Sequence, residues 1–388
     1  MPNYAAWLDS NEDYRRACSS VEGDLYLCGY LEYGTMTNSS GGLINQGWLD
    51  AVGMEPPTTY DEMHDVLTAF RDNGHPGALW MTNALEARSH IYASGYDLSL
   101  YQTPFLAVDG KAKSCYTDPD MLDYVTMLHQ WYEEGLIYPD FINVAAANDT
   151  IDTGLVTGET VGVYSGSYDT AQTMMRDSGV MQTPFPNLRK TPDQQLHVCA
   201  QTIYQKSGVS FGTTLSQDEI PIAAKMVDYL YSKDGVILSN FGVEGEGLEF
   251  DENGNPRCSD LILNNPDFPM AVIGIVIYSK YGGPGINFAP REYTAYDEDF
   301  WNACRVWNEN LDNDYELPFY SIFTTEEQER RDNLMSDIQT YVDENLLKFV
   351  IGDKPLSEWD DYVNTINSLG MEEVMDLYQT ALDRYQAA

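Results

Sequence analysis

Residues 208–212, Gly-Val-Ser-Phe-Gly, match the G-x-S-x-G pattern of a hydrolase nucleophile elbow. An elbow needs a strand before its serine, a helix directly after it and a histidine further along the chain. Here Ser210 falls inside an expected strand, the next helix is expected only from about Ile220, and the last histidine, His197, precedes the serine. The motif therefore does not predict a catalytic serine.

Oxygen-rich and sulfur-rich segments were considered as metal sites. Residues 251–256, Asp-Glu-Asn-Gly-Asn-Pro, carry calcium-type ligands, but Pro256 stands where a calcium loop requires glycine and no glutamate closes the loop. Asn253-Gly254 instead predicts a hairpin turn. The six cysteines are scattered, with neither a CxxC pair nor a histidine at zinc spacing, which leaves free thiols or one or two disulfides open. We expect no metal, no cofactor and no catalytic residue.

Aromatic rings adjoin amide, hydroxyl and carboxylate side chains in three turns. These turns lie at 80–83, at 164–169, and at 287–296 leading to Trp301. A sugar stacks its C–H faces on rings and pairs its hydroxyls with polar groups, so such turns suit carbohydrate binding. A glycosidase would need two carboxylates at a defined separation, which a chain this rich in acidic residues cannot reveal by pattern.

The composition limits the partners of the chain. The 388 residues include 61 acidic and 21 basic side chains, giving a formal net charge of -40. Such a field repels nucleic acid and anionic membrane surfaces, so we expect no nucleic-acid partner. The longest apolar run, 270–278, is far shorter than the roughly 20 residues of a membrane-spanning helix.

Apolar periodicity and caps predict the elements that must position these turns. Thr59 with Glu62 and Thr324 with Glu327 form capping boxes at the starts of two helices, and Thr325 with Gln328 offers an overlapping third box. Helices are expected over 59–73, 117–135, 220–238, 324–352, 357–370 and 371–385. Strands are expected over 160–164, 209–213 and 271–278. Strands alternating with helices of this length predict an α/β fold.

Four segments resemble a known family. They are "GWLDAVGMEPPTTYDEM" (47–63), "WYEEGLIYPDF" (131–141), "NFGVEGEG" (240–247), and "KFVIGDKPLSEWDDYVNTINSLG" (348–370) followed by "MEEVMDLYQTALDRY". The chain resembles the bacterial extracellular solute-binding proteins of family 1, the maltose-binding-protein type of ABC-importer lipoprotein. It is most similar to the large subgroup thought to take up oligosaccharides.

The resemblance implies a two-lobed, periplasmic-binding-protein-like α/β fold with several crossings between the lobes and hinge closure on a ligand. One lobe would comprise 43–205 and 291–388, and the other 1–42 and 206–290. Family members carry an export signal, a lipid-bearing cysteine and about half of the second lobe before the point that matches Met1. The resemblance therefore implies an N-terminally truncated member with that lobe incomplete.

The resemblance also implies ligand-binding residues. By position, the strand-to-helix turn with Ser167, Tyr168 and Asp169 matches a cleft-facing turn of the family, and Tyr168 is the leading candidate for sugar stacking. The remaining candidates are Asn83, Glu86 and Arg88 in a second loop, Tyr33, Asn38 and Glu246 in the incomplete lobe, and Trp301. The subgroup's Ile-Arg-x-Asp-Trp reads Ile-Asn-Gln-Gly-Trp at 44–48, so a basic side chain near the hinge is lost and a different ligand preference is expected.

The function that the resemblance implies is non-enzymatic. The chain would bind an oligosaccharide and deliver it to the permease subunits of an ABC importer. It would act at the extracellular face of the cell membrane, held only by a lipid anchor in the full-length form. Two alternatives stay open: a glycoside hydrolase that uses paired carboxylates, and a peptide-binding importer subunit.

Overall fold

A computed structural model describes residues 1–33, 39–82, 85, 90–100, 103–144, 151–198, 204–265, 267, 271–279, 285–288, 296–309, 315, 317 and 323–387. The chain forms two compact units. The first comprises residues 1–37, 202–302 and 319–322, and the second comprises 38–201, 303–318 and 323–388. The lobe boundaries expected from the resemblance remain a prediction.

The first unit is built on a three-stranded sheet of order β10-β1-β7. The central strand β1 (Cys28–Tyr33) pairs in parallel with β10 (Gly285–Phe288) and antiparallel with β7 (Tyr204–Val209). The hairpin β8 (Leu248–Phe250)–β9 (Pro256–Cys258) turns at Asn253-Gly254 as predicted, with Gly254 at a φ of 79°. The helices are α1 (Pro2–Asp9), α2 (Glu12–Cys18), α8 (Ile220–Tyr229), α9 (Lys233–Phe241), α10 (Asp260–Leu263) and α11 (Ala271–Tyr278).

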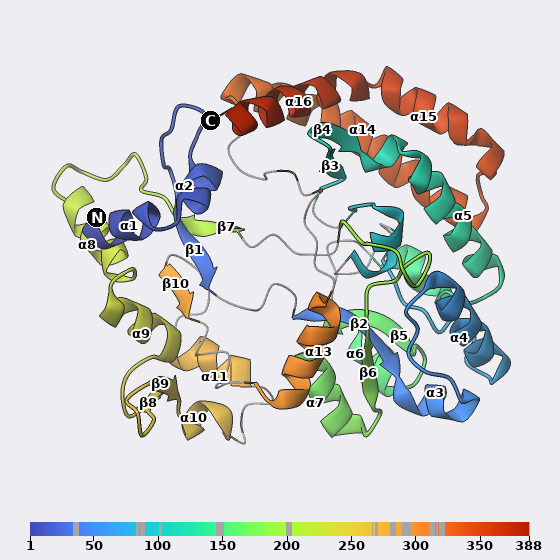
Figure 1. Ribbon diagram of the computed structural model, residues 1–388, viewed down its shortest axis with the longest axis horizontal. Coiled ribbons are helices and arrows are strands. Elements are labelled where there is room, and N and C mark those ends of the chain that lie inside the picture. The colour runs from blue at the N-terminus through green and yellow to red at the C-terminus, as the bar shows by residue number, and fades with distance from the viewer. Residues whose placement is uncertain are drawn as a thin grey trace. The chain divides into compact units, whose positions relative to one another are not determined.

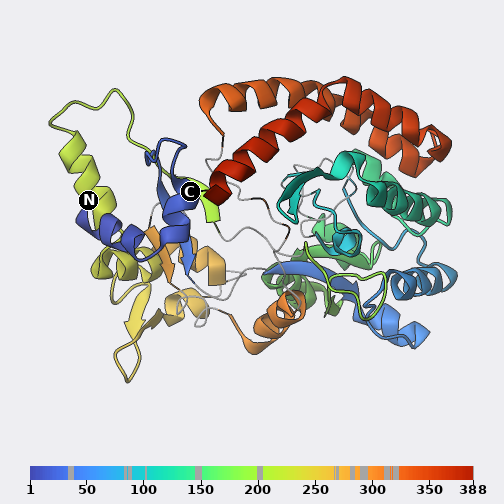
Figure 2. The same cartoon turned by 45° about the horizontal axis from the view of Figure 1, so that its top comes forward.

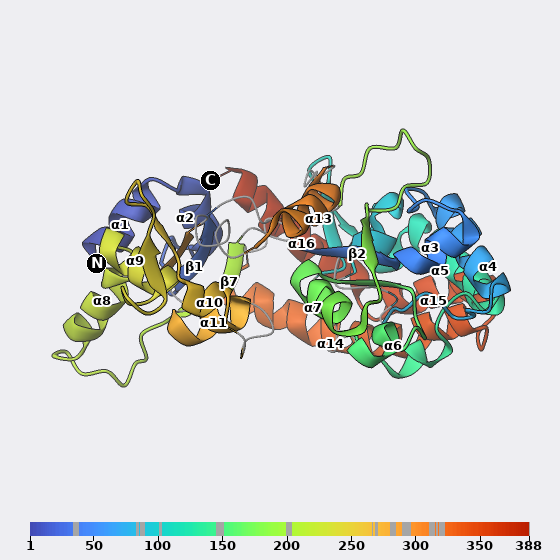
Figure 3. The same ribbon diagram turned by 90° about the horizontal axis from the view of Figure 1, so that it is seen from below.

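A buried carboxylate joins two helices of this unit. Asp228 of α8 accepts hydrogen bonds from the backbone N–H of Tyr4 (3.0 Å) and from Asn3 Nδ2 (2.9 Å) at the start of α1. It therefore supplies an acceptor to helix donors that Met1 leaves without a side-chain cap. The two helices lie side by side next to β1 (Figures 1 and 3).

The second unit contains the larger core. Its sheet has the order β5-β2-β6, with β2 (Ser40–Asn45) antiparallel to both β5 (Val163–Ser167) and β6 (Gln182–Phe185). Parallel bridges from Leu79 to Val163 and to Ile137 continue the sheet beyond β5. Helices and a hairpin surround this sheet: α3 (Gln46–Val52), α4 (Tyr60–Asp72), β3 (Phe105–Val108), β4 (Lys111–Ser114), α5 (Pro119–Glu133), α6 (Thr153–Thr157), α7 (Tyr168–Ser178), α14 (Thr325–Ile351), α15 (Trp359–Ser368), α16 (Met371–Ala387), and α13 (Glu298–Asn308) from Ala303 on.

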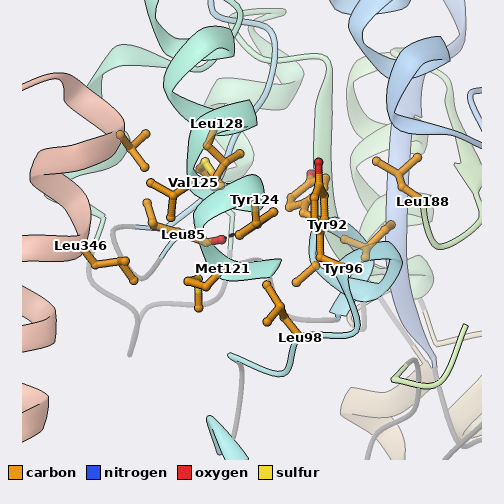
Figure 4. Packing of buried hydrophobic residues seen from close by; sticks show 14 of the residues in the cluster. Leu85, Tyr92, Tyr96, Leu98, Met121, Tyr124, Val125, Leu128, Leu188 and Leu346 are labelled. Carbon is orange, nitrogen blue, oxygen red and sulfur yellow. Dashed lines mark hydrogen bonds between the residues drawn. The ribbon is translucent and has the colours of Figure 1, made fainter. Parts of the chain in front are cut away.

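Apolar faces of helices supply most of this core. Helix α14 lies beside α5, α15 and α16 (Figure 2). Close by, Met121, Tyr124 and Val125 of α5 pack among buried leucines, and Tyr124 donates its hydroxyl hydrogen to the Leu85 carbonyl at 2.7 Å (Figure 4). That bond holds Leu85 in the left-handed backbone region, at a φ of 61°.

Most helix predictions are confirmed and the strand predictions are largely wrong. Both capping boxes at Thr59 and Thr324 form, and Gly352 ends α14, whereas Thr325 is already the first residue of α14 rather than a second cap. The helix expected over 220–238 is two helices, because Ser232 caps α9 by accepting the Gly235 N–H at 3.1 Å.

Residues 271–278 form helix α11 and not a strand. A continuous apolar run has no period to distinguish the two, and here Ile275 is buried against Ile262. The strand expected at 209–213 ends at Val209, and the one at 160–164 is shifted to Val163–Ser167.

The structure gives the thiol state of four of the six cysteines. Cys28, Cys115, Cys258 and Cys304 are buried free thiols. Cys199 and the side chain of Cys18 lie outside the described part of the chain.

An ion pair between α14 and α16 gives a testable pH dependence. Arg384 donates two hydrogen bonds to the Glu327 carboxylate (2.7 and 3.0 Å), and these bonds, above all other causes, hold the pKa of Glu327 below its ordinary value of 4.5. Because the folded pKa is depressed, the pair stabilises the fold above about pH 4.5 and this contribution is lost as pH falls through the folded pKa. We expect Arg384→Met to cost about 1–2 kcal/mol at pH 7.

Urea unfolding of Arg384→Met and wild type at pH 7 and pH 3 measures this effect. The difference between the two in free energy of unfolding should be largest at pH 7 and smaller at pH 3. Arg330→Met is the matched control, because Arg330 contacts Glu373 between the same two helices but with both side chains about half exposed. An equal loss in both variants would contradict the assignment.

Candidate functional site

Polar side chains gather where several strands of the second unit end or begin. The Val163 carbonyl accepts the Trp80 N–H at 2.8 Å in a parallel arrangement, so 80–82 and 165–167 leave the sheet at the same edge. Strand β2 enters there, with Ser40 paired to Ser167. Ligand sites of open α/β sheets occur at the carboxyl ends of strands. Three buried hydroxyl groups mark this edge: Ser40, Thr82 and Ser165.

The turn from β5 into α7 arranges three of the predicted site residues. Ser167 ends the strand, and its hydroxyl lies 2.9 Å from the Thr170 hydroxyl. Asp169 Oδ1 accepts the Thr170 N–H at 2.8 Å, which places a carboxylate in the first turn of the helix, where the helix dipole favours it. The Tyr168 N–H donates to the Ser39 carbonyl at 3.4 Å and joins the turn to the start of β2.

The ring of Tyr168 is only 8% exposed. It packs edge-on against Trp307 of α13, with ring centroids 6.3 Å apart and planes at 68°. Its hydroxyl also acts on Tyr164, whose pKa is raised mainly by burial and further by the neighbouring Tyr168. Most of the Tyr168 ring is therefore part of the packing, and the turn can present only the remainder to a ligand.

Gly41 of β2 makes room for Trp307, and the neighbouring Gly42 binds its indole through the backbone. A Cβ on Gly41 would lie 2.4 Å from the indole ring, and the indole Nε1 donates to the Gly42 carbonyl at 3.2 Å. Gly41 pairs with Gly166 of β5, so neither residue of the pair carries a side chain. Helices α13 and α7 lie beside β2 and β5 (Figure 1).

These glycines and Trp307 were not among the predicted site residues. The contact joins residues from opposite ends of the chain, so no local pattern could reveal it. The paired glycines in "SSGGLIN" were the available signal, because glycine inside a strand indicates a close approach by another group.

The positions of the other predicted residues relative to this edge remain a prediction. Asn38, Asn83, Glu86 and Arg88 lie outside the described residues, as does the side chain of Tyr33 at the end of β1. Glu246 is exposed between α9 and β8, where its carbonyl accepts the Ser259 hydroxyl. Trp301, at the start of α13, lies edge-on to Tyr296 and Phe300, with centroids 6.4 and 5.4 Å away.

Two searches restricted to the described residues found nothing further. No group of three or more His, Cys, Asp or Glu side chains is arranged to hold a metal ion in this part of the chain. Nor does any helix among these residues combine the length and apolar character needed to cross a membrane.

Comparison with solved structures identifies the class of fold. The chain superposes on a solute-binding protein of Bifidobacterium longum infantis, described as binding human milk oligosaccharides (HMO), with a TM-score of 0.78. The two are 19% identical, and the match covers 99% of this chain and 82% of the other. The fold is therefore the two-lobed α/β fold of solute-binding proteins, as predicted.

No family model matches the chain, but comparison with curated proteins finds relatives over most of its length. The fructooligosaccharide ABC transporter substrate-binding protein FusA of Streptococcus pneumoniae is 22% identical over 435 residues, covering 100% of this chain and 74% of FusA. The polygalacturonan/rhamnogalacturonan-binding protein YtcQ of Bacillus subtilis is 22% identical over 378 residues, covering 93% of this chain and 71% of YtcQ. These relatives are substrate-binding proteins of ABC transporters, and the similarity to them agrees with the family prediction.

Proposed function

We propose that the chain is the substrate-binding component of an ABC importer and that its ligand is an oligosaccharide. The observation that carries this proposal is a similarity extending over the whole chain to FusA, named for fructooligosaccharide transport. Relatives of the same kind act in transport, so the proposed role is binding and release without turnover. Permease subunits would receive the ligand at the extracellular face of the membrane.

The chemistry of the edge described above supports a sugar ligand. The hydroxyl of Ser167 and the carboxylate of Asp169 can pair with sugar hydroxyls, and the exposed remainder of the Tyr168 ring lies beside them, with the buried hydroxyls of Ser40, Thr82 and Ser165 behind. Several such hydrogen bonds with one stacked ring are compatible with micromolar affinity, about -8 kcal/mol. In this proposal the two compact units are the lobes of the family, and Asn83, Glu86, Arg88, Tyr33, Asn38, Glu246 and Trp301 stay proposed contacts.

A thermal-shift panel of neutral oligosaccharides, acidic oligosaccharides and short peptides tests the proposal. A ligand present at about 100 times its Kd stabilises the folded state by about 2.7 kcal/mol. For units of this size that corresponds to a rise in Tm of roughly 5–10 °C. We expect such a rise with at least one oligosaccharide and no new reducing ends after prolonged incubation.

Other outcomes would contradict the proposal in different ways. Release of reducing ends would favour the glycoside hydrolase. Stabilisation by peptides alone would favour the peptide-binding subunit. A flat response to every sugar, confirmed by calorimetry on the same samples, would remove the oligosaccharide assignment.

A further inference from the structure

The edge that carries the candidate site has an unusual charge composition. Residues 39–45, 78–82 and 163–170 contain no lysine, arginine or histidine, and their single charged side chain is Asp169. Hydroxyl and aromatic side chains, the amide of Asn45 and the thioether of Met81 make up the remaining functional groups. Any anionic group bound at this edge would therefore meet a carboxylate and no side-chain cation from these segments.

The helix that begins at this edge does not offer a free anion site either. The N-terminus of a helix attracts anions through its unpaired N–H groups and dipole. In α7 the carboxylate of Asp169 already accepts the Thr170 N–H at 2.8 Å. The positive end of the helix is thus compensated from within the chain.

Three cations of the second unit are paired with carboxylates of the same unit. Arg176, at the far end of α7, pairs with Asp177 at 3.0 Å. Lys190 pairs with Asp120 at 3.0 Å, and Lys113 with Asp118 at 2.9 Å. The chain as a whole carries a net charge of -40, so the long-range field opposes an anionic ligand as well.

A buried hydroxyl adds an observation that concerns an uncharged partner. Tyr164 of β5 is fully buried, and its hydroxyl has no hydrogen-bond partner among the described residues. It lies two residues before Gly166, whose Cβ position is 3.3 Å from the Tyr164 ring, and it interacts electrostatically with Tyr168. An unpaired buried hydroxyl can be satisfied by a neutral hydroxyl or a water, whereas a buried charge would need a counter-charge.

We infer that the described part of this edge, through the carboxylate of Asp169, favours uncharged oligosaccharides over uronic-acid oligosaccharides; the proposed contact Arg88 lies outside the described residues. This inference rests on the proposed function and adds the charge class of the ligand. The curated relatives leave that class open, because FusA is named for a fructooligosaccharide and YtcQ for polygalacturonan. A sugar carboxylate about 5 Å from Asp169, at an effective dielectric constant of about 20, is disfavoured on the order of 100-fold.

Two variants of α7 separate the local effect of Asp169 from the overall charge. Asp169→Asn and Asp177→Asn each remove one negative charge from the same helix, at its N-terminal and C-terminal ends. Binding is measured by calorimetry against two panels of trisaccharides, one neutral (kestose, maltotriose, xylotriose, mannotriose) and one anionic (trigalacturonate, trimannuronate). Thermal unfolding of each variant checks that the fold is retained.

We expect wild type to bind a neutral trisaccharide at least about 100-fold more tightly than either anionic one. Asp169→Asn should tighten anionic binding on the order of 100-fold, while Asp177→Asn leaves the preference unchanged. Binding of an anionic trisaccharide by wild type as tightly as any neutral one would overturn the inference and leave the proposed function intact. Equal effects of the two variants would also overturn it. Failure of every trisaccharide to bind would contradict the proposed function itself.

Discussion

The substitution Trp307→Ala is expected to lower the free energy of unfolding of the second unit by about 3–5 kcal/mol. The indole is 2% exposed and fills the space that Gly41 leaves free on β2. Its removal leaves a cavity over the sheet, breaks the hydrogen bond to the Gly42 carbonyl and frees the ring of Tyr168. Since Tyr168 begins the helix that carries Asp169, oligosaccharide binding should weaken together with stability.

Urea unfolding followed by tryptophan fluorescence and circular dichroism measures the loss. Trp301→Ala is the matched control, because Trp301 lies on the same helix with a partly exposed ring. It should lose clearly less stability.

Gly41→Ala tests the contact between Gly41 and Trp307 from the strand side. The added Cβ would overlap the indole, so the variant should lose about 1–3 kcal/mol of unfolding free energy. A Gly41→Ala variant as stable as wild type would show that Trp307 does not occupy this position.

The second large effect is expected at Tyr168. Tyr168→Ala should raise the Kd of the best oligosaccharide about 30-fold or more, the range of an aromatic contact at the centre of a binding site. Tyr168→Ala should also lower the free energy of unfolding, because Tyr168 is only 8% exposed and its ring packs on Trp307. Tyr168→Phe separates the two effects, since it keeps the packed ring and removes only the hydroxyl.

Calorimetry with the oligosaccharide found by the thermal-shift panel measures both Tyr168 variants. We expect Tyr168→Phe to fold normally and to weaken binding about five- to tenfold, the value of one hydrogen bond. Tyr132→Ala is the control for ring loss. Tyr132 of α5 also packs edge-on against another ring, that of Phe141, with centroids 5.9 Å apart. Unchanged affinity in both Tyr168 variants would remove Tyr168 from the site.

Local sequence patterns were informative where short-range interactions decide the structure. The capping boxes of Thr59 and Thr324 bind donors three residues away, so neighbouring residues alone specify where α4 and α14 begin. The apolar run at 271–278 carried no such information. These residues form helix α11, in which Gly274 and Ile275 pack against Ile262 of α10, a residue outside the run.

In the candidate site, too, some features follow from neighbouring residues and others from residues far apart in the chain. Ser167, Tyr168 and Asp169 are consecutive, and the expected strand-to-helix turn places them together without reference to the rest of the chain. The partners that hold this turn come from distant segments: Ser39 from the start of β2, and Trp307 from α13. Their contribution could not be predicted from spacing.

Composition and interactions within a few residues encode the α/β class, the capped starts of α4 and α14, the acidic field and the resemblance to solute-binding proteins. Folding of the whole second unit places Trp307 over Gly41, buries most of Tyr168 and brings the segment with Asp169 beside 39–45 and 78–82. The reason is physical. Strand pairing and ring packing join residues far apart in the chain, and their energies depend on the shape that the whole unit adopts on folding.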